Sequence, residues 1–224
     1  MNLARIHAVW ERISRFCLCS AFLLVPIFFL PLTLSPLNLN KQFIFIALVC
    51  LALVAWLIKG VSRGEWVYAT PPLNLLGLLR VVFVFFSSLF SGSKSLSFLG
   101  GANGSEMDTF IVTAALALLV FLLPAVFRKE QEMNWLLRAF FLSSSLVLVY
   151  SLLQLLGFTW LPWDFTKSAA FNSVGTTNAL GIYLGFVSIV ALTFFYRGKN
   201  FGNGQKIFLG ALAIISFIVS FLIG

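Results

Sequence analysis

The sequence predicts an all-α integral membrane protein with about seven transmembrane helices and a cytoplasmic N-terminus. Three observations support this fold class: the composition, the lengths of the apolar runs, and the distribution of positive charge. Of the 224 residues, 60% are hydrophobic and 10% are charged, whereas a soluble chain has about 45–50% apolar and about 25% charged residues. Such a chain cannot bury its apolar excess in a soluble core. The composition also excludes a disordered chain, a coiled coil and a disulfide scaffold.

The apolar runs have the length that a membrane span requires. A helix crossing a hydrocarbon layer of about 30 Å needs roughly 20 apolar residues. Seven runs meet this requirement, at residues 18–36, 42–58, 72–91, 109–127, 135–156, 177–196 and 207–223. They are apolar on all sides, whereas barrel strands alternate between apolar and polar residues. Helices are therefore predicted for all seven.

The first run follows a basic leader at residues 1–17. A signal peptide is disfavoured because the run is long, contains Pro26, Pro31 and Pro36, and lacks a small-residue cleavage site. We expect a retained span, kinked or broken near its outer end by the prolines. Apolar residues recur at helical spacing within the leader, which fits a short amphipathic helix on the inner leaflet, and a solvated basic leader fits the same residues. The predicted domains are this leader and a single transmembrane domain at 18–224.

Positive charge divides unequally between alternate loops. One side of the membrane receives ten cations: Arg5, Arg12, Arg15, Lys59, Arg63, Arg128, Lys129, Arg197, Lys199 and Lys206. The other side receives three, namely Lys41, Lys94 and Lys167. Because cytoplasmic loops are enriched in Lys and Arg, the N-terminus is predicted to be cytoplasmic. The net charge of +8 then reflects topology and attraction to anionic membrane lipid, and gives little support to nucleic-acid binding.

Few ionisable residues fall inside the predicted spans. No Asp or Glu lies clearly within one, which counts against a proton-coupled or sodium-coupled transporter. Arg80 lies about nine residues into the third span, where burial costs roughly 2.5–3.5 kcal/mol. It either snorkels toward the cytoplasm or faces a cavity and binds an anion. Arg138 lies nearer the inner end of its span, where snorkelling is favoured.

Metal sites and catalytic triads find no support, while one small-residue motif does suggest helix packing. The single His7 is on the predicted cytoplasmic side, and the three cysteines have no zinc-ligand spacing. No metal and no cofactor is predicted. Gly181 and Gly185 form a Gly-x-x-x-Gly pattern that lets helices approach closely. Packing within the chain is the favoured interpretation, and association with another chain is the alternative.

The outer segments contain the candidate binding residues. Lys94 begins a Ser-rich stretch in the segment at 92–108, and Lys167 precedes the sixth span. Residues 175–178, Gly-Thr-Thr-Asn, have the composition of a helix start, with Thr or Asn available as the cap. The free amides and positive dipole end of such a helix can also hold a phosphate, with Lys167 as the counter-charge. A helix cap and an anion site are both compatible with these residues.

Several segments together resemble the O-antigen ligase and polymerase superfamily of bacterial membrane proteins. A turn into the second span has the form Asn-x-x-Lys at residues 38–41. The other segments are Phe90-Ser91, Ser97-Phe98-Leu99-Gly100, Leu152-Leu-Gln-Leu-Leu-Gly157, Leu161-Pro162-Trp163, and residues 171–184 from Phe171 to Leu184. The resemblance covers nearly the whole chain.

The resemblance implies a multi-pass protein of the bacterial inner membrane that transfers a glycan from undecaprenyl diphosphate to an acceptor at the outer face, without a metal or a nucleotide. It implies that Lys167, Asn178 and Lys94 contact the lipid diphosphate. Arg80, if it faces a cavity from within the third span, is a further candidate for this contact. The chain departs from the family pattern at Thr176-Thr177, where Asn-Pro is usual. It also lacks the family's large later loop with its His, so we expect a C-terminally truncated chain carrying the N-terminal half. The alternative is a non-catalytic membrane subunit, or a flippase-like component that handles polyprenyl-linked glycans.

Overall fold

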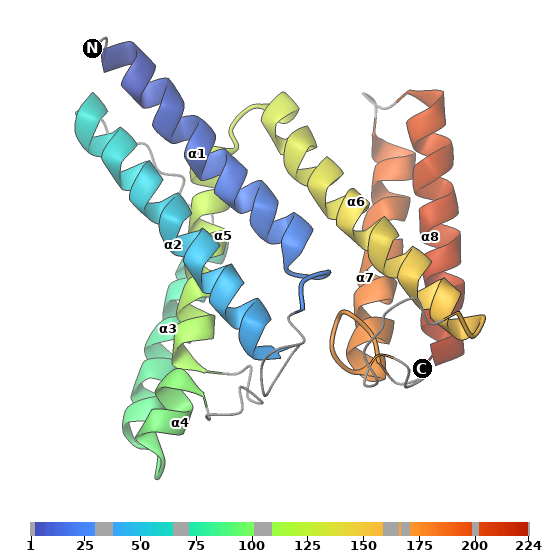
Figure 1. Cartoon of the computed structure of the whole chain (residues 1–224). Helices are drawn as coiled ribbons and strands as arrows, with labels where there is room; N and C mark the ends of the chain where they lie inside the picture. The colour runs from blue at the N-terminus through green and yellow to red at the C-terminus, as the bar shows by residue number, and fades with distance from the viewer. Residues whose placement is uncertain are drawn as a thin grey trace. The chain divides into compact units, whose positions relative to one another are not determined.

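The computed structural model describes residues 3–29, 38–64, 72–100, 109–158, 166, 171–198 and 202–223. Within these ranges the protein is all-helical. The helices are α1 (Leu3–Leu24), α2 (Asn38–Arg63), α3 (Pro72–Leu89), α4 (Lys94–Leu99), α5 (Phe110–Val126), α6 (Glu130–Leu155), α7 (Thr177–Arg197) and α8 (Asn203–Ile223). Figure 1 shows their course along the chain.

Five of the described helices are long and apolar enough to cross a membrane: α2, α3, α6, α7 and α8. They coincide with five of the seven predicted spans, so the chain is an all-helical, multi-pass membrane protein. Helix α5 matches the predicted run at 109–127 but has only 17 residues. Thr109 caps the start of this helix, because its side chain accepts a hydrogen bond from the amide of Val112 at 3.4 Å.

The predicted first span at 18–36 differs most from the structure. Helix α1 begins at Leu3, so one helix runs through the expected leader and into the expected span. It ends at Leu24, and residues 25–27 form a turn around Pro26. Proline disfavours helical backbone in the residue before it and cannot donate the next helical hydrogen bond. The break therefore comes earlier than the predicted outer end, and Pro31 and Pro36 lie outside the described residues.

The start of α2 also corrects an expectation. The four residues from Asn38 to Lys41 were predicted to form a turn outside the span, but they form the first turn of the helix. Both Asn40 and Lys41 are buried.

The chain divides into two compact units. The first comprises Met1–Val25 and Leu32–Ala139, and the second comprises Pro26–Pro31 and Phe140–Gly224. In the first unit α1 packs against α2, and both contact α5, while α3 contacts α4 and α5. Two hydrogen bonds show that α1 and α2 are antiparallel. One joins His7 Nδ1 and Ser62 Oγ (3.1 Å), and in the other Ser14 Oγ donates to the carbonyl of Ala52 (3.1 Å).

The core of the first unit is apolar and lies between α1, α2, α5 and the start of α6. Its buried members are Cys17, Leu18, Val49, Ala52, Leu122, Val126, Phe127 and Leu136. A second cluster, which is aromatic, joins α3, α4 and α5. Here the ring centroids of Phe85, Phe98 and Phe110 lie 5.4–6.0 Å apart. These two clusters hold the short helix α4 and the 17-residue α5 in place.

The second unit contains an antiparallel pair, α7 and α8, which lie side by side in Figure 1. The hydroxyl of Ser220 donates to the carbonyl of Gly181 at 2.7 Å, and a Cβ added at Gly185 would lie 3.5 Å from the same hydroxyl oxygen. Gly181 and Gly185 therefore pack within the chain, as the favoured interpretation predicted. The carboxy-terminal part of α6 joins this pair through Ser144 Oγ and Tyr183 Oη, 2.9 Å apart.

Candidate functional site

The candidate site is built around the start of α7, in the second unit. Thr176 precedes the helix with extended backbone, and its Oγ1 accepts a hydrogen bond from the amide of Ala179 at 3.1 Å. The helix-cap interpretation of this segment is thereby confirmed, with Thr176 as the capping residue.

A second side chain shapes the segment that leads into this cap. Asn172 is 2% exposed, and its Oδ1 accepts hydrogen bonds from the amides of Val174 (3.1 Å) and Gly175 (2.8 Å). This local turn needs Gly175, whose φ of +148° is unfavourable for other residues. The residues 171–176 are thus held by their own side chains before the helix begins.

The first turn of α7 presents unpaired backbone donors. Among the residues that the structure describes, none accepts a hydrogen bond from the amide of Thr177 or of Asn178, and both residues are exposed. These two amides lie at the positive end of the helix dipole, where an anion is stabilised by charge and by hydrogen bonds together. The Asn178 side chain is exposed beside them.

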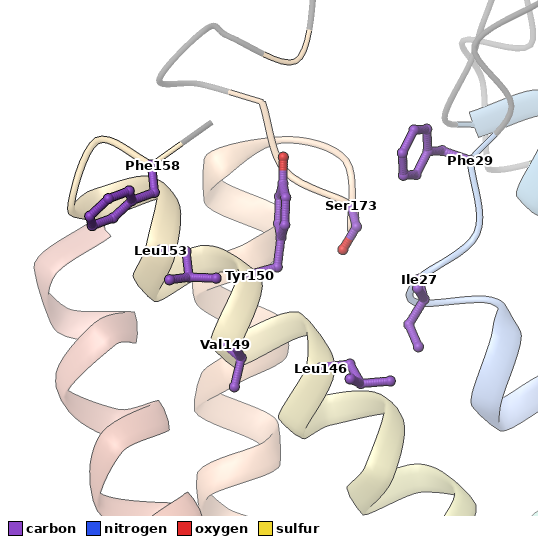
Figure 2. A pocket seen from close by; sticks show the side chains of 8 residues that line it. All are labelled: Ile27, Phe29, Leu146, Val149, Tyr150, Leu153, Phe158 and Ser173. Carbon is purple, nitrogen blue, oxygen red and sulfur yellow. The ribbon is translucent and has the colours of Figure 1, made fainter. Parts of the chain in front are cut away.

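An apolar pocket adjoins the same segment and is shown in Figure 2. Its volume is about 290 Å³, and Ile27 and Phe29 face the side chains of α6 across it. The lining residues are Ile27, Phe29, Leu146, Val149, Tyr150, Leu153, Phe158 and Ser173. Among these described lining residues, the polar side-chain atoms are the hydroxyls of Tyr150 and Ser173.

The aromatic ring of Phe171 connects the pocket to the start of α7. Its centroid lies 5.7 Å from that of Phe29 and 6.2 Å from that of Tyr150, both in edge-to-face geometry. Phe171 is buried, as are the next two residues in the chain. The apolar pocket and the capped helix start therefore share one ordered segment, so a ligand with a long apolar part and an anionic part could contact both.

Not all four candidate binding residues predicted from the sequence lie at the start of α7 or at the apolar pocket. Asn178 lies in the first turn of α7, and Lys167 lies outside the described residues. Arg80 and Lys94 belong to the first unit, where each is exposed. Arg80 is nine residues before the end of α3, roughly 13 Å along the axis, and Lys94 begins the next helix. The structure therefore does not bring Arg80 and Lys94 together.

Lys94 stands beside a group of hydrogen-bonded serines at the corner between α3 and α4. Ser97 Oγ donates to Ser91 Oγ at 2.7 Å, and Ser88 Oγ donates to the carbonyl of Ser97 at 3.5 Å. These bonds orient the corner and use its hydroxyls locally.

Within the described ranges no group of three or more His, Cys, Asp and Glu side chains could hold a metal ion.

Sequence reasoning missed the pocket, although a weak signal was present. Leu146, Val149, Tyr150 and Leu153 recur at helical spacing along one face of α6. The same spacing is typical of a helix face that contacts lipid or the protein core. It therefore does not identify a pocket unless the segment on the opposite side, which contains Ile27 and Phe29, is known. The contribution of Ile27 and Phe29 depends on the turn after α1, which comes earlier in the chain than the predicted break near the outer end of the first span.

Comparisons of the chain with protein-family models, with curated proteins and with solved structures found no match.

Proposed function

We propose that the chain is the part of an O-antigen-ligase-like glycan transferase that binds undecaprenyl diphosphate at the outer face of the bacterial inner membrane. The sequence resemblance motivates the proposal. In it, the diphosphate is held at the start of α7, and the polyprenyl chain lies against apolar surface. Lys167, Asn178, Lys94 and Arg80 are the side chains assigned to the diphosphate, with Asn178 the one that belongs to the described site.

One observation supports the proposal most directly: two unpaired amides of α7 and an apolar pocket adjoin the same segment, residues 171–176. A polyprenyl diphosphate combines a doubly or triply charged head with a branched hydrocarbon chain. The amides of Thr177 and Asn178 suit the head, and the Leu, Val, Ile and Phe lining of the pocket suits the chain.

The chemistry proposed for this site is electrostatic. Glycan transfer releases a diphosphate leaving group, whose negative charge increases in the transition state. Oriented amides and a nearby cation lower the energy of that charge without having to reorient during the reaction. Lys167 supplies the cation in this proposal. The residue that activates the acceptor is not assigned to this chain.

The proposal includes a topology of seven spans with a cytoplasmic N-terminus. It rests on the ten-to-three division of Lys and Arg between alternate loops. This topology exposes the start of α7 at the outer face. Alkaline phosphatase fused after Lys167 is expected to be active, because the enzyme folds only outside the cytoplasm. An inactive fusion there, together with an active fusion after Lys199, would reverse the orientation.

Binding measurements on the purified chain in nanodiscs test the function. We expect tight binding of undecaprenyl diphosphate and much weaker binding of undecaprenol, which lacks the phosphates. Lys167→Ala should weaken diphosphate binding by about tenfold, as expected for a lost charge-assisted contact of about 1.5 kcal/mol. Lys199→Ala is the matched control and should have no effect. Equal affinity for the two lipids would contradict the proposal.

A transfer assay separates the leading proposal from a non-catalytic role. The variants are tested in cell membranes for ligation of a labelled glycan. If Lys167→Ala reduces both diphosphate binding and transfer in membranes, the transferase is supported. Normal transfer despite lost binding favours the subunit or flippase-like alternative.

A further inference from the structure

A second binding feature lies in the first unit, away from the start of α7. A groove of about 560 Å³ opens between the middle of α1 and the start of α6. Among the residues that the structure describes, its charged lining consists of Arg12, Arg15, Lys129 and Glu132, which is three cations and one carboxylate, a net charge of +2. Its apolar lining consists of Phe16, Cys19, Phe127 and Trp135, and Gln131 completes it.

The carboxylate in this groove is already neutralised. Glu132 Oε1 accepts from Arg15 Nη2 at 2.7 Å, and Arg15 also pairs with Glu11. Glu11 in turn accepts from Lys59 Nζ at 3.2 Å. These two cations and two carboxylates form an ionic cluster with no net charge.

The other oxygen of Glu132 is also occupied. Its Oε2 accepts from the amides of Arg128 (3.2 Å) and Lys129 (3.3 Å), a capping arrangement at the start of α6. Because both oxygens are engaged, this side chain opposes an incoming anion only weakly.

Arg12 and Lys129 carry the remaining charge of the groove. Both side chains are exposed, and in the part of the chain that the structure describes neither forms an ion pair. Arg12 comes from α1, and Lys129 immediately precedes α6. A guanidinium and an ammonium lining one groove are the donors that proteins use to hold a phosphate.

The position of the groove indicates what carries the phosphate. Helix α6 is a candidate membrane span that begins at Glu130, so its first turns lie where the span meets the membrane surface. Phe16 is 72% exposed and Trp135 is 67% exposed, although both line the groove. The guanidinium of Arg138 lies 5.8 Å from the centre of the Trp135 ring. Tryptophan beside arginine is typical of the headgroup level of a bilayer.

We infer that this groove binds an anionic phospholipid, with its phosphate between Arg12 and Lys129 and its acyl chains against Phe16 and Trp135. Basic pockets between membrane helices recognise such headgroups through charge, while the apolar lining matches the glycerol and upper acyl region. A soluble anion would gain nothing from the two exposed aromatic rings. The inference does not depend on the function proposed above.

Tryptophan quenching by brominated lipid tests this inference on the full chain. The protein is reconstituted in phosphatidylcholine vesicles that contain increasing fractions of brominated phosphatidylglycerol. The chain has six tryptophans, so the difference from the Trp135→Phe variant isolates the signal of the groove. We expect Trp135 to be quenched at a lower fraction of brominated lipid than random mixing gives. Removing either Arg12 or Lys129 should raise the midpoint of quenching, the fraction of brominated lipid that gives half of the signal, about fivefold.

The key comparison uses two double variants that remove the same net charge. Arg12→Gln/Lys129→Gln empties the groove of its free cations, whereas Arg197→Gln/Lys206→Gln removes two cations of the second unit that do not line it. Only the first should shift the midpoint, and Arg12→Lys should retain most of the binding. Equal shifts in both double variants would show attraction to the surface as a whole and overturn the inference. So would equal quenching of Trp135 by brominated phosphatidylcholine.

Discussion

Replacing Thr177 by proline removes one amide donor from the start of α7 with little disturbance of the helix. Thr177 is the first residue of the helix, a position that proline tolerates because its amide has no helical acceptor. The residue before it, Thr176, has φ −97° and ψ 159°, which is the extended backbone that a following proline requires. The capping bond from Ala179 to Thr176 does not involve the amide that is lost.

The expected effect follows from the loss of one hydrogen bond to a charged group. Such bonds contribute about 1.5–3 kcal/mol, and the exposure of Thr177 places this one at the lower end. A loss of about 1.5 kcal/mol corresponds to roughly a tenfold weaker Kd for undecaprenyl diphosphate. Binding of undecaprenol should not change, because this lipid has no group for the amide to contact.

Equilibrium binding to the purified protein in nanodiscs provides the measurement, with the thermal unfolding temperature as a check on folding. Thr177→Ala is the matched control, since it removes the hydroxyl and keeps the amide. The reasoning is refuted if Thr177→Pro binds the diphosphate as tightly as Thr177→Ala while both variants unfold at the wild-type temperature. In that case the start of α7 would be a capped helix and no more.

Two further predictions concern stability. Gly185→Ala should change the unfolding temperature little, because the added Cβ lies at ordinary contact distance from Ser220. Gly185→Leu should lower the free energy of unfolding by about 1–3 kcal/mol through overpacking. Gly204→Leu is the control, because a Cβ at Gly204 has nothing within 4 Å, and an equal loss of stability there would contradict this account. Burial raises the pKa of Glu11, but the hydrogen bond from Lys59 and the charges of Lys59, Arg15 and Arg63 outweigh it and hold this pKa below its usual value of 4.5. The carboxylate therefore stabilises the fold above pH 4.5 and loses this effect as the pH falls through its lower folded pKa. Glu11→Gln should accordingly have a lower unfolding temperature than the wild type at neutral pH, and this difference in unfolding temperature should disappear in acid. A difference in unfolding temperature that stays constant in acid would argue against the ion pairs.

The apolar runs predicted most helices because a run of about 20 apolar residues has few alternatives in a membrane. They did not predict where α1 begins, since hydropathy reports which residues suit hydrocarbon and says nothing of a helix that continues into polar sequence. The same limitation applies to Lys41, which was assigned to a loop because it is charged and is instead part of α2. Thr176 as a cap could be predicted because capping depends on local sequence alone.

The pocket and the groove could not be predicted for a different reason. Each depends on residues far apart in sequence: Phe29 with Tyr150 in the pocket, and Arg12 with Lys129 in the groove. Side chains of the same type face lipid elsewhere in the chain. Only the tertiary arrangement distinguishes an apolar residue that lines a cavity from one that contacts hydrocarbon.

The tight contact between α7 and α8 has a consequence for biosynthesis. The two helices are consecutive, and only residues 198–202 separate them. Their interface, with Ser220 bonded to Gly181, can form as soon as the second helix leaves the insertion machinery, because contacts between neighbouring segments require little loop closure. The pair can then enter the bilayer as a preassembled hairpin, and the carbonyl of Gly181 gains a second hydrogen-bond donor before it is surrounded by lipid.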